Sequence, residues 1–553
     1  MKKYIITAAL PYANGPIHIG HLSGVYIPSD IYSRYLRCID KNVVFICGSD
    51  ENGAAISIKA KKENTTPKKI INKYHSIIKK SFLKFGISFD NYSRTSSKIH
   101  HKTASNFFKK LLKKDILINE KSKQYYDEYA KQFLADRYII GTCPFCNNDK
   151  SYGDQCEKCG SYLNNKDLKN VKSIISDKKP ILKETNNWFI KLYKYNNFIK
   201  KWFFSKKWKD NVYGQVKSWI KKGLKKRSIT RDLYWGVPVP NEKNKVLYVW
   251  FEAPIGYISS TIEWAKKNKK NWKDYWMVDN TELIHFIGKD NIVFHCILFP
   301  IMLKAHGNFI IPKKIIANEF MNLENKKIST SKNWAIWIND FIKYFPNNID
   351  SLRYFLIINM PEKKDSNFTW KKFKKHNNNE LIAILGNFIY RIMILTKKKF
   401  NQKIPKPNLL RKKDYYIIDK IKFFQKEIEK NIKLFKFKNG MKLIIYIAKI
   451  GNKYLTEEEP WKKENYLKNI IYTSFQIIGL ITHLLYPFLP KTSEKLYKFL
   501  NIKKINWKKI KKIKHIIKPG HLIGKPFCLF KKIENKELEK KIKKMNKIKN
   551  VNF

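Results

Sequence analysis

Two histidines, His18 and His21, stand just after a turn and could bind a phosphate group. Asn14 and Gly15 supply the turn chemistry, and Gly20 lets a ligand lie close to the backbone. At the N-terminus of a helix, imidazole donors face an anion where the helix dipole already favours negative charge. The pattern predicts a site for a nucleoside triphosphate, although in isolation it also fits a loop that carries two surface histidines.

The elements beside this turn read as strand, turn and helix. The run Tyr4–Leu10 is short, apolar and rich in β-branched and aromatic residues, which is typical of a buried strand. Pro28 predicts that the helix after the turn is kinked or starts late. The apolar residues of that helix recur at roughly helical spacing: Leu22, Val25, Tyr26, Ile31, Tyr32 and Tyr35.

A second buried strand is predicted at Val43–Cys47 and is followed by Asp50. A strand, a crossover helix and a strand that ends in an acidic residue form half of a doubly wound nucleotide-binding sheet. Asp50 lies where the ammonium group of a ligand could pair with it. An Asx-turn is an equally good interpretation of the residue on its own.

Four cysteines form two knuckles, Cys143–Cys146 and Cys156–Cys159, with glycines beside them at 141, 153 and 160. Four thiolates at this spacing suit tetrahedral Zn²⁺ and leave no open coordination position, so the predicted site is structural. A redox pair is the weaker interpretation because the knuckles occur in tandem. The other cysteines, Cys38, Cys47, Cys296 and Cys528, are expected to be buried, and no disulfide framework is indicated, which favours a reducing cytoplasm.

The second half of the sheet is expected to begin near Ile229–Asp232 and to continue through Leu247–Tyr257. A third strand is predicted at Leu283–Ile287. It is followed by Gly288 and by Asp290, which is placed to accept from ribose hydroxyls.

Aromatic residues near position 250 could wall a slot. Trp250 and Tyr257 offer flat apolar surfaces, although a Trp-Phe pair at a strand end is more often core. Further along, the stretch Lys326–Lys332 places lysines on a Ser/Thr-rich loop, where an ammonium group can follow a phosphate as a mobile point charge.

The stretch around His18 and His21 resembles the His-Ile-Gly-His motif of class I aminoacyl-tRNA synthetases. The flanking residues Ala9–Gly15 resemble the methionyl-tRNA synthetases in particular, and Lys326–Lys332 resembles the Lys-Met-Ser-Lys-Ser loop of the class. One position departs from that loop, because Thr330 stands where the family has its second lysine. Lys327, helped by Lys332, is then expected to carry more of the contact with phosphate.

The resemblance implies that the chain activates methionine with ATP, with Mg²⁺ assisting, and transfers it to tRNA(Met). The implied catalytic residues are His18, Gly20, His21, Lys327 and Thr330. The implied ATP site comprises Asn14, Gly15, His18, His21, Gly288, Asp290, Lys327, Thr330 and Lys332. A slot of polarizable aromatic surface suits a thioether. The implied methionine site comprises Leu10, Tyr12, Asp50, Trp250, Ala253, Pro254, Tyr257 and His295, with Asp50 on the ammonium group.

The resemblance also implies a helical anticodon-binding domain, and amphipathic runs at 414–437, 440–456 and 466–487 agree with one. Asn387 and Arg391 match positions that meet the anticodon, and Trp461 matches a base-stacking tryptophan. On its own, Trp461 would be interpreted as a half-buried core residue.

The expected fold is α/β, with a doubly wound parallel catalytic sheet, a zinc-knuckle insertion and a helical bundle. The expected parts are the first catalytic half (1–114), the insertion (115–230), the second half (231–325), the loop and stem-contact region (326–375), the anticodon domain (376–530) and a basic tail (531–553). The tail is expected to be solvated. Because no further oligonucleotide-binding domain follows, a monomer is expected.

Composition agrees with these expectations without deciding them. Lys plus Arg number 112 against 45 for Asp plus Glu, a net charge of +67 that invites a polyanionic partner, although compositional drift toward lysine explains much of it. No run is expected to span a membrane, and no secretory signal precedes the first strand.

Two other functions stay open at this point. A synthetase of the same class for leucine, isoleucine or valine commonly carries a large editing insertion, whereas the zinc element takes most of 115–230. A zinc-containing RNA-binding protein without catalysis would not need both His18 and His21.

Overall fold

The structure is a computed structural model, and it describes residues 2–550 except Asp154, Gln155, Glu157, Gly160–Tyr162, Asn164, Ser331, Lys463, Lys511 and Lys514. Gly160 and Ser331, named above, therefore lie outside the described residues, as do 551–553 of the tail. The chain forms two compact units, each built from separate stretches: residues 1–16, 44–80 and 89–317, and residues 17–43, 81–88 and 318–553.

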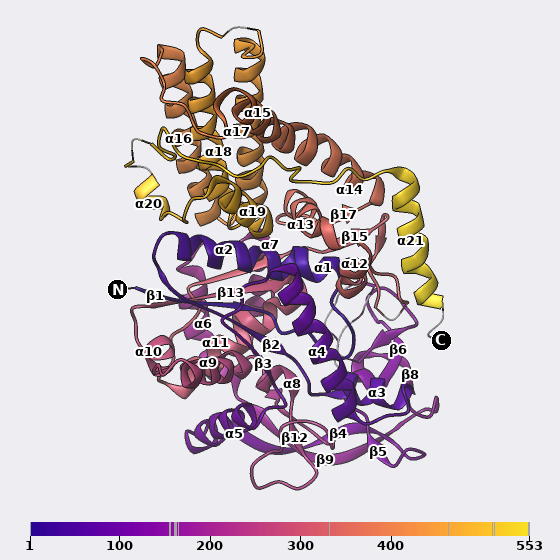
Figure 1. Ribbon diagram of the computed structural model, residues 1–553. Helices are drawn as coiled ribbons and strands as arrows, with labels where there is room; N and C mark the ends of the chain where they lie inside the picture. Colours follow the sequence, from indigo (N-terminus) through magenta and orange to yellow (C-terminus); the bar gives the residue numbers. More distant parts are fainter. Residues whose placement is uncertain are drawn as a thin grey trace. The chain divides into compact units, whose positions relative to one another are not determined.

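The first unit contains a five-stranded sheet in the order β14-β13-β1-β2-β3 (Figure 1). Strand β1 pairs in parallel with β13, and β2 pairs in parallel with β3. These pairings bring the carboxyl ends of β1, β2 and β13 to one edge of the sheet, where ligands bind in folds of this kind. The strands are β1 (Lys3–Ala8), β2 (Asn42–Ser49), β3 (Asn91–Arg94), β13 (Thr281–Gly288) and β14 (Lys314–Asn318).

Helices pack on this sheet, and the strand interiors Ile5, Ile46 and Leu283 are fully buried in one apolar core. The helices and helical turns of this part are α3 (Ala54–Lys62), α4 (Pro67–Phe85), α5 (Lys98–Lys113), α8 (Val249–Glu252), α9 (Ile255–Lys267), α10 (Lys273–Trp276), η5 (Lys289–Asn291), η6 (Phe294–Leu298) and α11 (Phe299–His306).

The prediction that the parallel sheet resumes near residue 229 is wrong. Strands β11 (Thr230–Arg231) and β12 (Val246–Leu247) pair with each other as a separate antiparallel ribbon. Residues after β12 are helical, in α8 and α9, although their β-branched and aromatic composition suggested a strand. Pro254 ends the one short helix and lies at the N-cap of the next, which short-range composition could not reveal. The sheet itself resumes at β13.

Between α5 and β11 the chain forms the predicted insertion. It contains a long antiparallel pair of strands, β4 with β9, and a small three-stranded sheet in the order β7-β6-β8. The cysteine knuckles lie in the loops that connect the strands of this small sheet. The elements of the insertion are β4 (Leu117–Asp127), β5 (Gln132–Phe133), η2 (Asp136–Tyr138), β6 (Ile139–Thr142), β7 (Ser151–Tyr152), η3 (Asn165–Asp167), β8 (Lys169–Ser173), β9 (Ile181–Ile190), η4 (Leu192–Tyr195), α6 (Asn196–Phe204), α7 (Asp210–Lys222) and β10 (Arg227–Ser228).

The second unit begins at the helix after the first turn. This helix starts as α1 (Ile19–His21), passes through a π-helical stretch, η1 (Leu22–Tyr26), and continues as α2 (Ile27–Cys38), where Pro28 occupies the first turn. Pro28 therefore lies within continuous helical backbone, directly after the π-helical stretch. The prediction of a late start is wrong, because the helix begins at Ile19, and a kink at Pro28 stays a prediction.

The rest of this unit is mainly helical, and the three predicted amphipathic runs are α16, α17 and α18 (Figure 1). The elements are β15 (Met321–Leu323), β16 (Lys326–Lys327), α12 (Ile338–Tyr344), η7 (Pro346–Asn348), α13 (Ile349–Ile358), β17 (Ser366–Phe368), α14 (Trp370–His376), η8 (Asn377–Gly386), α15 (Asn387–Phe400), α16 (Lys412–Lys433), α17 (Phe437–Glu458), α18 (Leu467–Leu485), α19 (Pro490–Leu500), α20 (Trp507–Ile510) and α21 (Asn535–Asn550).

One continuous helical stretch, Trp370–Phe400, is long and apolar enough by length and composition to cross a membrane, although no run of that kind was expected from the sequence. Its apolar side chains Leu381, Phe388 and Ile389 are fully buried, and the stretch packs against α17 and α18. A core helix of a bundle meets the same criteria of length and composition.

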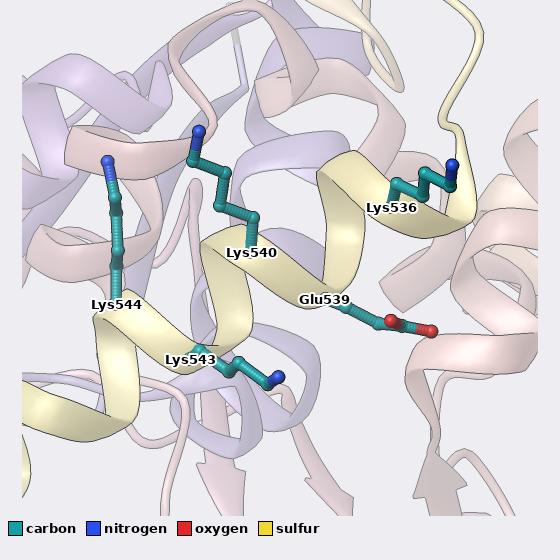
Figure 2. Close-up of a pocket in the computed structure, with 5 residues that line it drawn as sticks. All are labelled: Lys536, Glu539, Lys540, Lys543 and Lys544. Atoms are coloured by element: carbon teal, nitrogen blue, oxygen red, sulfur yellow. The ribbon is translucent and has the colours of Figure 1, made fainter.

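The tail helix α21 presents Lys536, Lys540, Lys543 and Lys544 with Glu539 (Figure 2). Lys540 and Lys544, one turn apart, extend from the same side of the helix. The same helix also carries apolar side chains, and two of them, Leu538 and Met545, are buried. The tail is therefore helical, and the prediction of a solvated end holds for its lysines but not for Leu538 and Met545.

Candidate functional site

His18 closes the N-terminus of α1. Its Nδ1 atom accepts hydrogen bonds from the backbone N–H groups of Gly20 (3.1 Å) and His21 (3.4 Å), and the backbone N–H of His18 donates to Nδ1 of His21 (3.2 Å). This reciprocal arrangement is a capping box built from two histidines. The two rings are stacked, with centroids 3.7 Å apart.

The capping bonds fix the tautomer of both rings. Because each Nδ1 accepts a hydrogen bond, a neutral ring carries its own proton on Nε2. Burial and the neighbouring His21 hold the pKa of His18 well below its ordinary value, and burial lowers the pKa of His21 to about 4. Both rings are therefore neutral at pH 7, and each has an Nε2–H group as its remaining donor.

The lysine loop lies against this turn, within the same unit. Backbone N–H groups of Ile19 and Ile338 donate to the carbonyl oxygens of Ile336 (3.2 Å) and Ile17 (2.9 Å) respectively. A side chain at Gly20 would lie 3.0 Å from the His18 ring and 3.4 Å from Ile328, so glycine permits this approach. Residues near 20 and 328, about 300 positions apart, are thus brought together.

The loop itself is a short hairpin. Ser329 and Trp334 exchange backbone hydrogen bonds (3.0 and 2.9 Å), and the backbone N–H of Lys332 donates to Oγ of Ser329 (3.3 Å). Lys327, Thr330 and Lys332 are exposed. Exposed lysines on a hairpin can reach a phosphate without the desolvation cost that a buried ammonium would pay.

In the first unit, four of the residues predicted to surround a thioether, Leu10, Tyr12, Trp250 and Ala253, belong to one small apolar cluster. Tyr248, Val249 and Ala253 are buried, and Leu10, Tyr12 and Trp250 pack against them. Trp250 stacks face to face on Phe294, with centroids 3.8 Å apart and planes within 7°. Pro254 is the N-cap residue of α9, and it places Tyr257 on the first turn of that helix.

Tyr257 and His295 form a directed pair beside this cluster. Nδ1 of His295 lies 3.0 Å from the carbonyl oxygen of Asn291 and must donate to it, so Nε2 is left to accept the Tyr257 hydroxyl proton at 2.9 Å. Burial lowers the pKa of His295 to about 4, so the ring is neutral at pH 7. The pair therefore offers no charge to an apolar ligand.

Asp50 lies at the end of β2 and is 4% exposed. Its backbone bonds to Pro11 and Ala13 (both 2.8 Å), which ties it to the chain beside Tyr12. Its Oδ1 atom has no hydrogen-bond partner among the described residues. Burial, reinforced by Glu252, raises the pKa of Asp50 well above its ordinary value. A cationic ligand would satisfy this oxygen and stabilise the charged carboxylate.

The remaining residues predicted to bind ATP lie at the ends of β1 and β13. Asn14 and Gly15 are half-buried in the turn after β1. Asp290 is exposed in η5, directly after β13, and its carboxylate folds back so that a side chain at Gly288 would lie 2.5 Å from Oδ1. This position, at the carboxyl end of a parallel strand, is the one predicted.

The four knuckle cysteines come together. Their sulfur atoms all lie within 4.8 Å of one another, with Sγ–Sγ distances of 3.9 Å (Cys143–Cys159) and 3.5 Å (Cys146–Cys156). A tetrahedral Zn²⁺ with Zn–S bonds of about 2.3 Å needs sulfurs about 3.8 Å apart, so the set fits. The Ser151 hydroxyl donates to Cys156 Sγ at 3.2 Å, a contact that supports a thiolate. All eight cysteines are free of disulfides, but Cys528 is exposed and Cys38 half-buried, so the prediction of burial is wrong for Cys528.

We expect the purified chain to carry about one zinc ion, and Cys146→Ser to lose it, because three thiolates hold a structural ion far more weakly than four. Elemental analysis of the purified proteins measures the ratio. Cys528→Ser, which removes an exposed cysteine outside the cluster, is the matched control and should retain the metal. Equal zinc content in the two variants would contradict a four-cysteine site.

In the helical part, Arg391 and Trp461 are in contact. The Arg391 guanidinium lies 4.6 Å from the centroid of the Trp461 ring, and Trp461 is 50% exposed. Asn387, one turn before Arg391, is exposed at the start of α15. A half-exposed indole with an arginine stacked on it is a surface on which an unpaired base can stack.

Sequence reasoning missed two further features of these sites. Trp337 forms a backbone bridge with His18, and its ring centroid lies 6.0 Å from that of His18. Glu252 and His100 form a buried contact next to Asp50, with Nε2 and Oε2 2.6 Å apart. Glu252 lies inside the predicted Leu247–Tyr257 stretch, where an acidic residue within an apolar run is unusual and could have indicated a functional site. Nothing in the sequence marks His100.

Comparisons with known proteins agree on one family. A model described as class I tRNA synthetases (M) matches residues 4–393, and one described as the anticodon binding domain of methionyl tRNA ligase matches 404–550. The methionine–tRNA ligases of Christiangramia forsetii and Bacteroides fragilis are 53% and 50% identical to the chain, each over 100% of it and 82% of their own length.

A solved structure of Mycobacterium tuberculosis methionyl-tRNA synthetase in complex with methionyl-adenylate has the same fold. It superposes with a TM-score of 0.79 at 19% identity and covers 96% of the chain and 100% of its own. The apo form of the same protein gives a TM-score of 0.72.

Proposed function

The chain belongs to the methionine–tRNA ligase family of class I aminoacyl-tRNA synthetases, and from this premise we propose how its residues divide the reaction. The enzyme joins methionine to ATP, releasing pyrophosphate, and transfers the methionyl group from the adenylate to the 3′ end of tRNA. Synthetases for leucine, isoleucine or valine and a non-catalytic RNA-binding protein are excluded by the same matches.

Methionine supplies its own nucleophile, since its carboxylate attacks the α-phosphorus of ATP in line and pyrophosphate leaves. No side chain needs to form a covalent bond or remove a proton. The protein must hold the two reactants in line and stabilise negative charge on the phosphate oxygens. The ATP enters with Mg²⁺, which neutralises part of the triphosphate charge.

We assign the triphosphate to His18, His21 and Lys327. The observation that carries this assignment is the contact between the α1 turn and the lysine hairpin, which brings Gly20 next to Ile328. Two neutral rings would donate through Nε2–H, and the exposed lysine would add charge. Thr330 and Lys332 lie on the same hairpin, and Gly20 gives the phosphates room.

We expect Lys327→Ala to lower the rate of methionine-dependent ATP–pyrophosphate exchange about tenfold to a hundredfold, because a cation on the transferring phosphates is lost. Lys326→Ala removes the adjacent exposed lysine of the same strand and is the matched control, expected to stay within about twofold. If the two variants fall equally, the loop acts only through its general charge and the assignment of Lys327 fails.

Asp290 is assigned to the ribose hydroxyls, beside Gly288, and Asn14 and Gly15 to the nucleotide-binding turn. The methionine side chain is assigned to the cluster of Leu10, Tyr12, Trp250, Ala253, Pro254, Tyr257 and His295, and its ammonium group to Asp50. Support comes from the uncharged Tyr257–His295 pair and from the unpartnered buried Oδ1 of Asp50. A thioether fits polarizable aromatic surfaces of this kind.

For tRNA(Met), we propose that Asn387, Arg391 and Trp461 meet the anticodon. The stacked pair of Arg391 and Trp461 supports this, because base stacking on a half-exposed indole reads unpaired nucleotides. Residues 376–530 would then be the anticodon-binding domain, residues 1–114 and 231–325 the two catalytic halves, and residues 326–375 the loop and stem-contact region.

The insertion, residues 115–230, would hold Zn²⁺ through Cys143, Cys146, Cys156 and Cys159, where it cross-links a small sheet and supplies no catalytic position. A cytoplasmic location and a monomeric state stay predictions, and sedimentation of the purified chain measures the latter.

A further inference from the structure

Glu252 is a buried carboxyl group beside the proposed methionine site that the reaction as described does not use. Its side chain is 0% exposed. Its Oε1 accepts a hydrogen bond from Nδ2 of Asn52 at 3.0 Å, and its Oε2 lies 2.6 Å from Nε2 of His100, which is also 0% exposed. Asn52 is two residues beyond Asp50, so one short segment connects the two carboxyl groups.

The hydrogen bonds around His100 have a definite direction. The Ser259 hydroxyl donates to the carbonyl oxygen of Gly256 (3.1 Å), so its oxygen is left to accept from Nδ1–H of His100 (3.0 Å). A neutral His100 then has a lone pair on Nε2, and the contact with Oε2 needs the proton of a neutral Glu252. The alternative is a charged pair, with imidazolium and carboxylate both buried.

The charges around Glu252 can be counted. Glu51 is paired with Arg94, whose Nε lies 2.8 and 2.9 Å from the two carboxylate oxygens. Among the residues that the structure describes, Glu252 also interacts with two titratable groups, Asp50 and His100. Apart from the Glu51–Arg94 pair, two carboxyl groups and one imidazole therefore share a buried space. The methionine ammonium would bring only one positive charge to it.

We propose that Glu252 works as a positioning residue in its protonated form, donating to His100 so that Asp50 is the single carboxylate that meets the methionine ammonium. The proposal rests on the assignment of Asp50 to the ammonium group made above. The proton on Glu252 completes the chain from Asn52 to Ser259, which holds the Asp50–Asn52 segment against α8.

Electrostatics support the neutral pair. Burial raises the pKa of Glu252 to about 8 and lowers the pKa of His100 to about 3, so that at pH 7 the proton belongs to the carboxyl group. A buried charged pair would cost the desolvation of both ions, and only one contact links them. With Glu252 neutral, the like charge that raises the pKa of Asp50 is also removed.

The test is the pH dependence of the methionine KM in ATP–pyrophosphate exchange for Glu252→Gln, which keeps the shape and both hydrogen bonds of a neutral Glu252. In the wild type, KM should rise as the pH falls and Asp50 gains a proton that methionine must displace. We expect Glu252→Gln to stay within about threefold of the wild-type KM at pH 7. The acid limb of its profile, the range in which the methionine KM rises as the pH falls, should have a midpoint within about 0.3 pH units of that of the wild type.

An ionised Glu252 would give a different result. Removing a neighbouring negative charge would lower the pKa of Asp50, so the acid limb of Glu252→Gln would move down by about one pH unit or more. That shift, or a folded Glu252→Gln variant with a KM raised more than about tenfold at pH 7, overturns the proposal.

Glu252→Ala removes the hydrogen bonds as well, so that Nε2 of His100 loses its partner and Asn52 keeps only its contacts with Thr95. The methionine KM of Glu252→Ala should rise about tenfold or more, whereas Glu252→Gln should preserve methionine binding. An unchanged KM in a folded Glu252→Ala variant also overturns the proposal. Asp50→Asn tests the assignment of Asp50 separately from the role of Glu252. An unchanged methionine KM in Asp50→Asn would refute the ammonium assignment itself, whatever Glu252→Gln shows.

Discussion

The variant His21→Ala is expected to lose about a hundredfold in the rate of methionine-dependent ATP–pyrophosphate exchange, roughly 3 kcal/mol of transition-state stabilisation. His21 is neutral and its Nδ1 accepts from the backbone N–H of His18, so the catalytic contribution that we propose for it is the Nε2–H donor. Loss of a single donor aimed at the developing phosphate charge has an effect of this size. The methionine KM should change little, because we assign the amino acid to other residues.

A loss of rate with an unchanged methionine KM distinguishes this role from a general disturbance of the fold. His376→Ala is the control, since His376 is a half-buried histidine of the same unit, hydrogen-bonded to Glu380 away from the α1 turn. It should leave exchange within about twofold. A folded His21→Ala variant that retains more than about a third of the wild-type rate would show that the ring does not reach the phosphates.

The second large effect is expected for Asp50→Asn, which should raise the methionine KM about a hundredfold. The substitution keeps the shape of the side chain but removes the charge that would pair with the ammonium group in a buried site, where such a pair is worth several kcal/mol. The ATP KM should change little. The variant is expected to fold normally, because burial already raises the pKa of the wild-type carboxyl group well above its ordinary value, and an uncharged amide of the same shape suits that buried position.

A methionine analogue that lacks the amino group sharpens this test. The wild type should discriminate strongly between methionine and 4-(methylthio)butanoate as competitors, and Asp50→Asn should lose most of that discrimination. Equal discrimination in both proteins would mean that another group recognises the ammonium.

The sequence was sufficient for the strand-turn-helix unit around His18, because turn residues, apolar periodicity and a helix start coincide within about 30 residues. The cysteine cluster could be predicted for a similar reason, since four thiolates at fixed spacing have few other uses. The helices α16, α17 and α18 followed from amphipathic spacing that is strong over about five turns each.

Other parts depend on contacts distant in sequence and could not be predicted. The segment after β12 has strand-like composition but forms α8 and α9, because tertiary packing outweighs local propensity in a short apolar run. The Glu252–His100 contact joins residues 152 positions apart. That the imidazoles cap their own helix, which leaves Nε2 as the remaining donor of each neutral ring, emerges only from the geometry.

The most direct test of the central claim is a crystal structure of the protein with a non-hydrolysable ATP analogue. We expect Nε2 of His18 and His21 and Nζ of Lys327 to lie within hydrogen-bond distance of the same triphosphate. A triphosphate that contacts only one of these two segments, or neither, would contradict the account.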